Sequence, residues 1–218
     1  MSESAPTRVR VWDVPTRVVH WSMVLLFAFS WWSAENGELE WHRWSGYSLT
    51  ALVLFRLYWG FFGGSTARFS QFLRGPRAVV SYLRGDAVQQ VPGHNPVGAW
   101  SVVVMLALLA TQIALGLFAV DVDGLESGPM SSLVSFDTGR AAAGWHETIF
   151  NVLLAIVAVH ILAAFYYLIV RKQNLIGAMF TGKRDLDGTH APLIPASAVR
   201  LIVGILLAAA LTWLISRE

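Results

Sequence analysis

Long apolar runs alternate with short polar segments along most of this 218-residue chain. A membrane-spanning helix needs about 20 residues to cross the hydrocarbon core of a bilayer, and five of the runs are about that long or longer. We expect them at residues 17–34, 42–63, 96–120, 144–170 and 197–215. This pattern predicts an all-α fold, an integral membrane helical bundle with five transmembrane helices.

Composition supports the bilayer as the solvent and limits the chemistry of any metal site. Hydrophobic residues make up 55% of the chain and charged residues only 14%, whereas soluble domains carry about 25% charged residues. The chain has no cysteine, which excludes disulfides, Cys-ligated zinc, Cys-ligated iron–sulfur clusters and covalent c-type haem. Any metal or haem must therefore be held by His, Met, Tyr or carboxylate side chains.

The basic residues indicate an orientation. Most of the 16 Lys and Arg residues lie before the first span, between the second and third spans, or between the fourth and fifth. The positive-inside rule therefore predicts a cytoplasmic N-terminus, and five crossings place the C-terminus on the outer side of the membrane. This distribution also explains the net charge of +2 without a nucleic-acid partner.

Two connecting segments carry further predictions. Residues 70–85 mix apolar side chains with three arginines, which favours a short interfacial helix on the cytoplasmic surface. The Gly75-Pro76 pair is expected to break or start it. The outer segment 121–143 is predicted to be irregular, and loops of such length are often functional or dock a partner.

Four of the six histidines lie at or inside the ends of predicted spans: His20, His42, His146 and His160. Histidine inside a membrane span is by default a functional hypothesis. His146 and His160 are 14 residues apart, so they share nearly one helix face and are separated by about 21 Å along it. At matching depth, His160 is expected to pair with His20 near the cytoplasmic face, and His146 with His42 near the outer face.

Two imidazoles on facing helices can supply both axial nitrogens to a haem iron. Gly46, one turn after His42, would let the flat macrocycle approach the helix backbone closely. Iron with two nitrogen ligands has no open position, which favours electron transfer over oxygen chemistry. Two alternatives stay open: any single histidine can be a plain interfacial residue, and zinc or copper binding would require the ligands to converge.

Three more residues are candidate cofactor contacts, each with a structural alternative. His94, in a GHNP turn, either contacts a haem propionate or a quinone, or is an ordinary loop residue. Arg56, deep in the second span, either pairs with a propionate or extends its side chain to the interface. Arg17 either reaches a propionate or anchors the start of the first helix. His190, in a polar loop, has no expected haem role.

Several short motifs occur in the order seen in one family. They are VWDVPTRVVHW at residues 11–21, HRWSGY from His42, GHNPVGAW from Gly93, and WHE around His146, followed by His160. Over residues 11–171 the chain resembles the bacterial di-haem cytochromes of the cytochrome b561 superfamily, most of all the cytochrome b subunits that serve nickel–iron hydrogenases. This resemblance implies two b haems bound by the four histidines, and electron exchange with the membrane quinone pool.

The resemblance divides the chain in two. Residues 1–171 are expected to form a four-helix di-haem core, and residues 172–218 a cytoplasmic loop and a fifth transmembrane helix of open role. The leading function is transmembrane electron transfer between the quinone pool and a periplasmic redox partner, such as a c-type cytochrome or a hydrogenase. The alternatives are a stand-alone quinone-linked oxidoreductase that uses a small reductant such as superoxide, and a non-redox transporter or anchor. The sequence leaves open whether the chain is an enzyme and whether it forms a homo-oligomer.

Overall fold

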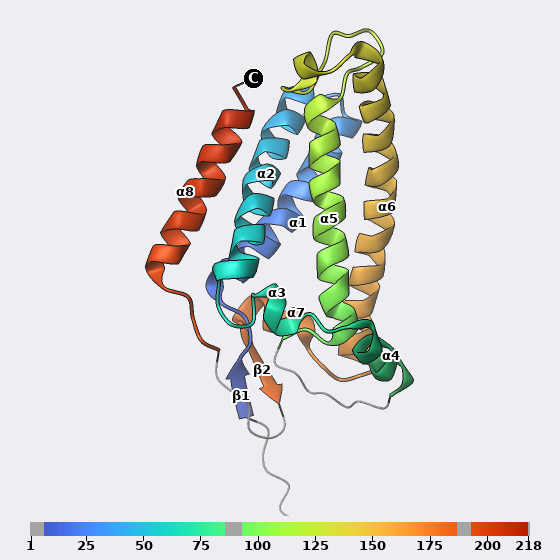
Figure 1. Ribbon diagram of the computed structural model, residues 1–218. Helices are drawn as coiled ribbons and strands as arrows, with labels where there is room; N and C mark the ends of the chain where they lie inside the picture. The colour runs from blue at the N-terminus through green and yellow to red at the C-terminus, as the bar shows by residue number, and fades with distance from the viewer. Residues whose placement is uncertain (1–6, 86–92, 187–192, 218) are drawn as a thin grey trace, which may run out of the picture. The chain divides into compact units, whose positions relative to one another are not determined.

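The computed structural model describes residues 7–85, 93–186 and 193–217, and most of these are helical (Figure 1). Its elements in chain order are β1 (Thr7–Arg10), α1 (Val14–Glu35), α2 (Leu39–Phe62), α3 (Phe69–Phe72), α4 (Pro76–Arg84), α5 (Pro96–Phe118), η1 (Ser131–Leu133), α6 (Phe136–Ile169), α7 (Leu175–Thr181), β2 (Lys183–Leu186) and α8 (Ala198–Ile215). The all-α prediction is confirmed. His190 lies outside the described residues.

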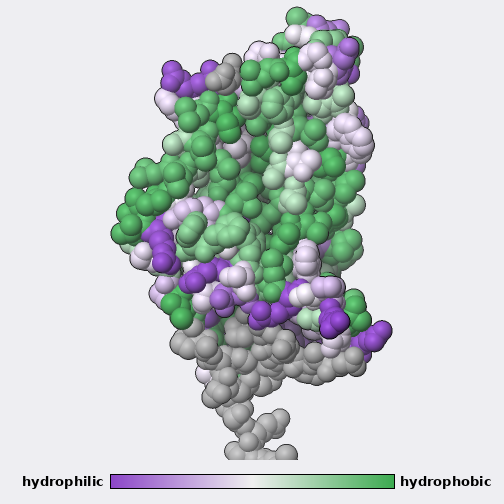
Figure 2. Space-filling model, in the orientation of Figure 1, coloured by the Kyte–Doolittle hydropathy of each residue, from purple (hydrophilic) through white to green (hydrophobic). Residues whose placement is uncertain are grey.

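Each of the five predicted spans corresponds to a long helix, but the helices differ in apolarity. Among the described residues, α5, α6 and α8 are both long enough and apolar enough to cross a membrane. The helices α1 and α2 are long enough, with 22 and 24 residues, but less apolar. The physical reason is that they hold the histidines His20 and His42 together with buried polar residues such as Ser30, Ser45 and Arg56. Figure 2 shows hydrophobic side chains over most of the visible face of the long helices and hydrophilic side chains near their ends.

The chain forms two compact units, each built from three separate stretches. The first unit comprises Met1–Val18, Leu57–Val104 and Val159–Ile202, and the second comprises Val19–Arg56, Met105–Ala158 and Val203–Glu218. The long helices α1, α2, α5, α6 and α8 each contribute one part to each unit. His42 and His146 both belong to the second unit, whereas His20 belongs to the second and His160 to the first.

The core of the second unit is where four helices meet. Val53 of α2, Leu109 of α5 and Leu153 of α6 form a buried cluster, and Met23 and Phe27 of α1 pack against it. The four helices of the expected haem core are therefore packed together in this unit. Apolar side chains hold these helices together in the cluster, so the polar side chains on the same helices are available for other contacts.

The start of α1 is fixed by the buried carboxylate of Asp13. Its Oδ1 accepts a hydrogen bond from the backbone N–H of Thr16 at 2.9 Å, as an N-cap residue does, and Pro15 in the first turn suits that position. Its Oδ2 accepts a hydrogen bond from Nε1 of Trp59 on α2, also at 2.9 Å. One side chain thus caps the first helix and ties it to the end of the second.

A small antiparallel sheet completes the first unit, and the sequence did not predict it. Strand β1 pairs with β2 from Thr7 opposite Leu186 to Arg10 opposite Lys183. Their inward side chains join Val11, Trp12 and Ala178 of α7 in a buried cluster. Part of the segment expected to be a plain loop, residues 172–196, is therefore ordered as α7 and β2.

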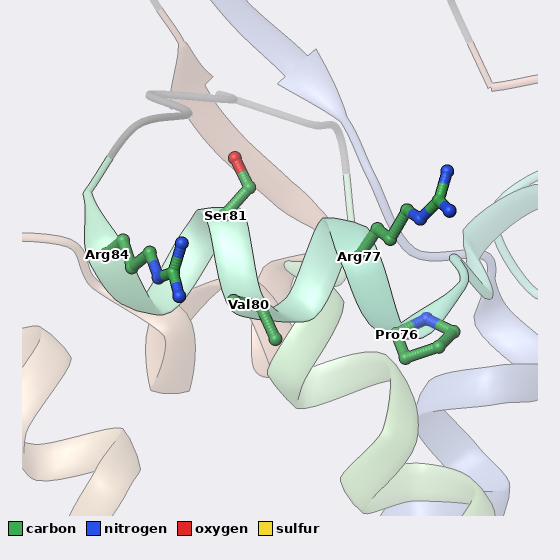
Figure 3. Close-up of a pocket in the computed structure, with 5 residues that line it drawn as sticks. All are labelled: Pro76, Arg77, Val80, Ser81 and Arg84. Atoms are coloured by element: carbon green, nitrogen blue, oxygen red, sulfur yellow. The ribbon is translucent and has the colours of Figure 1, made fainter.

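The helix predicted within residues 70–85 forms as α4, and the Gly75-Pro76 pair starts it as expected. Its interfacial position stays a prediction. Gly75 is its N-cap and Gly85, with a positive φ of 80°, ends it. No residue of α4 is buried, and Leu83 is 69% exposed. Figure 3 shows the arginines Arg77 and Arg84 on this helix, beside a shallow cavity that α4 residues line.

Helix α6 begins at Phe136, eight residues before the predicted start of this span at residue 144, so His146 lies ten residues after the start of the helix and not at its end. Ser135 caps the new start, because its Oγ accepts a hydrogen bond from the backbone N–H of Thr138 at 3.3 Å. Asp137 in the first turn is favoured by the helix dipole. The polar and glycine-rich composition of these residues suggested a loop, but the cap and three consecutive alanines at 141–143 continue the helix.

Candidate functional site

The second unit brings His42 of α2 and His146 of α6 into one site. Their ring centroids are 6.1 Å apart, and their planes are inclined at 81°. In a linear imidazole–metal–imidazole arrangement, each metal–nitrogen bond is about 2 Å long and each nitrogen lies about 1 Å from the centre of its ring. The two ring centroids are then about 6 Å apart. The observed separation therefore fits two axial ligands of one iron.

Backbone carbonyls hold both rings in the orientation that a metal ligand needs. Nδ1 of His42 lies 2.9 Å from the carbonyl oxygen of Ser30 on α1, and Nδ1 of His146 lies 2.9 Å from that of Gln112 on α5. A carbonyl oxygen only accepts hydrogen bonds, so each Nδ1 carries the proton and donates it. Each Nε2 is then left with its lone pair as the nitrogen that can bind metal, and this is the usual arrangement of metal-ligating histidines.

Two glycines shape the space around the pair. A Cβ placed on Gly46, one turn after His42, would meet no atom within 4 Å, so the space beside α2 is open, as a flat macrocycle requires. A Cβ on Gly116 of α5 would lie 2.9 Å from Cε1 of His146. Gly116 therefore makes room for the imidazole itself, and Gly46 leaves room beside it.

The other two candidate ligands lie on the expected helices. His20 is in α1, with its ring edge-to-face against Trp21 at 5.1 Å. His160 is on α6, 14 residues after His146 in the same unbroken helix. The pairing of His20 with His160 stays a prediction, because the two belong to different units. No group of three or more His, Asp or Glu side chains that could hold a metal ion occurs among the residues that the structure describes.

The remaining candidates have well-defined surroundings in the structure. His94 lies between Trp12 and Phe72, with ring centroids 4.6 and 4.9 Å away. The guanidinium of Arg17 donates to the carbonyl oxygen of Phe180, at the end of α7. Arg56 is buried, with 6% of its surface exposed. Their contacts to a propionate or a quinone stay predictions, and the observed bond of Arg17 matches its alternative role as an anchor of the start of α1.

Three features of the site were missed in the sequence: the carbonyls of Ser30 and Gln112, and Gly116. Backbone carbonyls leave no signal in a sequence. The side chain of Gln112 is a visible signal in the sequence, because it is a polar residue in the middle of an apolar span. In the structure it is buried, with 8% of its surface exposed. A buried glutamine one helix away from a candidate ligand is a reasonable marker of such a site.

A comparison with known families gives the family of the chain. The model of the family described as prokaryotic cytochrome b561 matches residues 11–182. The chain belongs to this family. No curated protein and no solved structure matched it. This cytochrome is therefore a haem b-binding membrane protein of electron transport, from a family whose members usually bind two haems. The match ends before α8, the helix that lies outside the expected haem core.

The donor set suits haem b. Imidazole nitrogens are common axial ligands of haem iron, and noncovalent binding agrees with the absence of cysteine. In this site His42 and His146 would hold the iron through Nε2, and the Ser30 and Gln112 carbonyls would fix the two rings. Open space beside Gly46 would receive the macrocycle edge.

A larger residue at position 116 is expected to disturb the site selectively. In a Gly116→Val variant the new side chain meets Cε1 of His146, which is bonded to Nε2, so the coordinating nitrogen is displaced. We expect the affinity for one of the two haems to fall about 10- to 100-fold, the usual cost of disturbing the support of a metal ligand. Haem titration of the haem-depleted protein, followed by its absorption spectrum, measures this change.

The matched control for this variant is Gly144→Ala. Position 144 is two residues before His146 on α6, and a Cβ there would meet no atom within 4 Å. If both variants bound haem as the wild type does, Gly116 would not support the ligand.

Proposed function

We propose that this cytochrome carries electrons across the bacterial inner membrane through two bis-histidine b haems. His42 and His146 would hold the outer haem, and His20 and His160 the inner one. The electrons would pass between the quinone pool and a redox partner on the periplasmic side, with the N-terminus in the cytoplasm. The observation that carries this proposal is the His42–His146 pair, whose separation and Nδ1 hydrogen bonds suit two axial ligands.

The ligand arrangement supports electron transfer over chemistry at the iron. A bound haem supplies one-electron exchange between ferric and ferrous iron. An imidazole on each side leaves no position where oxygen or a substrate could bind to that iron. The rings are held from helices other than their own, α1 and α5, so the ligand geometry is rigid. An electron carrier requires that the ligands move little when the iron changes its charge.

The charge of the outer loop indicates which kind of electron partner the protein would use on that side. The segment from Val120 to Gly139 carries four carboxylates and no Lys or Arg. An acidic surface repels a small anion such as superoxide at long range and attracts a basic protein. A protein partner is therefore favoured over a small anionic reductant on the outer side.

The proposal predicts two b haems per chain that a quinol can reduce. The purified protein in proteoliposomes should show a b-type α band in its reduced-minus-oxidised spectrum, with two haems per chain by pyridine haemochrome assay. Addition of a quinol should reduce at least one of them. A preparation with no α band would overturn the haem assignment, and full haem content without reduction by quinol would overturn the quinone link.

A further inference from the structure

The loop between α5 and α6, residues 119–135, combines a fixed backbone with an unusual surface. Three backbone hydrogen bonds tie it to itself and to α5: Asp121 N to Glu126 O at 3.0 Å, Gly128 N to Ala119 O at 2.8 Å and Met130 N to Leu117 O at 2.9 Å. The guanidinium of Arg140 on α6 also donates to the Val120 carbonyl at 2.8 Å. The loop is therefore a shaped surface, although the sequence predicted an irregular segment.

The tip of this loop exposes apolar side chains among carboxylates. Leu125 is 83% exposed and Val122 72%, with Asp123 exposed between them. Elsewhere in the described chain, exposed leucines and valines are found mostly on the long helices, where lipid accounts for them. Glu126 at the edge of the tip forms an ion pair with Arg43 at 2.9 Å, which orders the edge without covering Leu125.

The loop also reaches the haem-ligand pair through two contacts. A Cβ on Gly128 would clash with the carbonyl oxygens of Gly116 and Leu117, so the loop backbone lies directly on the last turns of α5. Gly116 is also the glycine in close contact with the His146 ring. A protein seated on this loop would therefore be connected to His146 through two neighbouring segments of backbone.

We propose that the tip formed by Val122, Asp123 and Leu125 is the docking surface for a soluble electron-carrier protein whose own surface has an apolar centre ringed by lysines. This inference rests on the proposed function, and it names the partner's chemistry and its place. Charge complementarity selects that occupant, because the segment from Val120 to Gly139 carries four carboxylates and two arginines contact it, Arg43 through Glu126 and Arg140 through the Val120 carbonyl, which leaves a net negative charge. Acidic lipid headgroups would be repelled by the same carboxylates, which disfavours the bilayer as the cover of the tip.

Binding measurements on the haem-loaded full chain in lipid nanodiscs test the docking surface. The probe is a small lysine-rich c-type cytochrome, and the matched probe is the same protein with its lysines acetylated. We expect the unmodified probe to bind with an affinity that falls as salt rises, and the acetylated probe to bind much more weakly. The variant that carries both Asp123→Asn and Leu125→Ser should lose about tenfold in affinity, with a smaller salt dependence.

The control is Glu38→Gln, which removes one exposed carboxylate from the α1–α2 turn of the same unit and should leave the affinity within about twofold. Equal binding by the wild type and the loop variant would overturn the docking surface. Binding in detergent but not in nanodiscs would also overturn it, because lipid would then cover the tip. The loop variant keeps its haem spectrum and quinol reduction, so a missing α band or missing quinol reduction points instead to a failure of the proposed function.

Discussion

Replacing either His42 or His146 by alanine is expected to remove one of the two haems and leave the other. In the proposed site each imidazole would supply one axial nitrogen, and the other ring, 6.1 Å away, would supply the second. Loss of one ligand leaves a single nitrogen, and the macrocycle is not attached covalently. The haem content per chain, measured by pyridine haemochrome assay, should therefore fall from two to one in each variant. The protein should still be folded and monodisperse in detergent.

The spectrum should show which haem is lost. Ring planes inclined at 81° give low-spin ferric iron with a strongly anisotropic EPR signal, and that signal should disappear in both variants. A His190→Ala variant serves as control, because His190 is the histidine for which the sequence predicts no haem role. Retention of two haems in His42→Ala would contradict the assignment.

Double substitutions are expected to distinguish histidines of one site from histidines of different sites, because in the proposed arrangement α6 contributes one ligand to each site. Replacing His42 and His146 together should cost no more haem than replacing either alone, since both would serve one iron. Replacing His146 and His160 together should abolish haem binding, since these two residues of the same helix would each serve a different haem. The haem content per chain should be one for the first double variant and zero for the second.

The His20 and His160 pair gives the complementary result. The double variant His20→Ala with His160→Ala should keep one haem, and it should be the one with the anisotropic signal. If this variant lost both haems, or if the His146 and His160 double variant kept one, the pairing of ligands across helices would be incorrect. Circular dichroism of each variant establishes that the helices have formed, so that loss of haem is read as loss of ligand.

Most of the helical architecture could be predicted because it follows from length and apolarity. The predicted and observed ends of the second, third and fifth helices differ by three residues or fewer. The early start of α6 could not be predicted, because residues 136–144 resemble a loop in composition and are stabilised by a cap and by packing of Gly139 against Val120. The β1–β2 pair was missed for a related reason. Four-residue strands with charged side chains carry little local signal, and long-range pairing creates them.

The candidate site, like the fold, could be predicted only in part. The approach of His42 to His146 could be predicted from the depth of each residue in its span, whereas the pairing of His20 with His160 stays a prediction. The supporting carbonyls of Ser30 and Gln112 could not be predicted, because every residue has a carbonyl and only the packed helices determine which one meets an imidazole. The tight contact at Gly116 likewise depends on how α5 approaches α6.

The unbroken course of α6 through both histidines limits how this protein can change its length. Inserting one residue between His146 and His160 would turn one imidazole by about 100° and shift it by about 1.5 Å relative to the other. Either ligand pair would then lose its facing geometry, even though every side chain had been kept. Insertions in the segments between helices leave the interval between the two histidines unchanged. Divergence in chain length is therefore expected to accumulate in those connecting segments, while the interval of 14 residues in α6 stays constant.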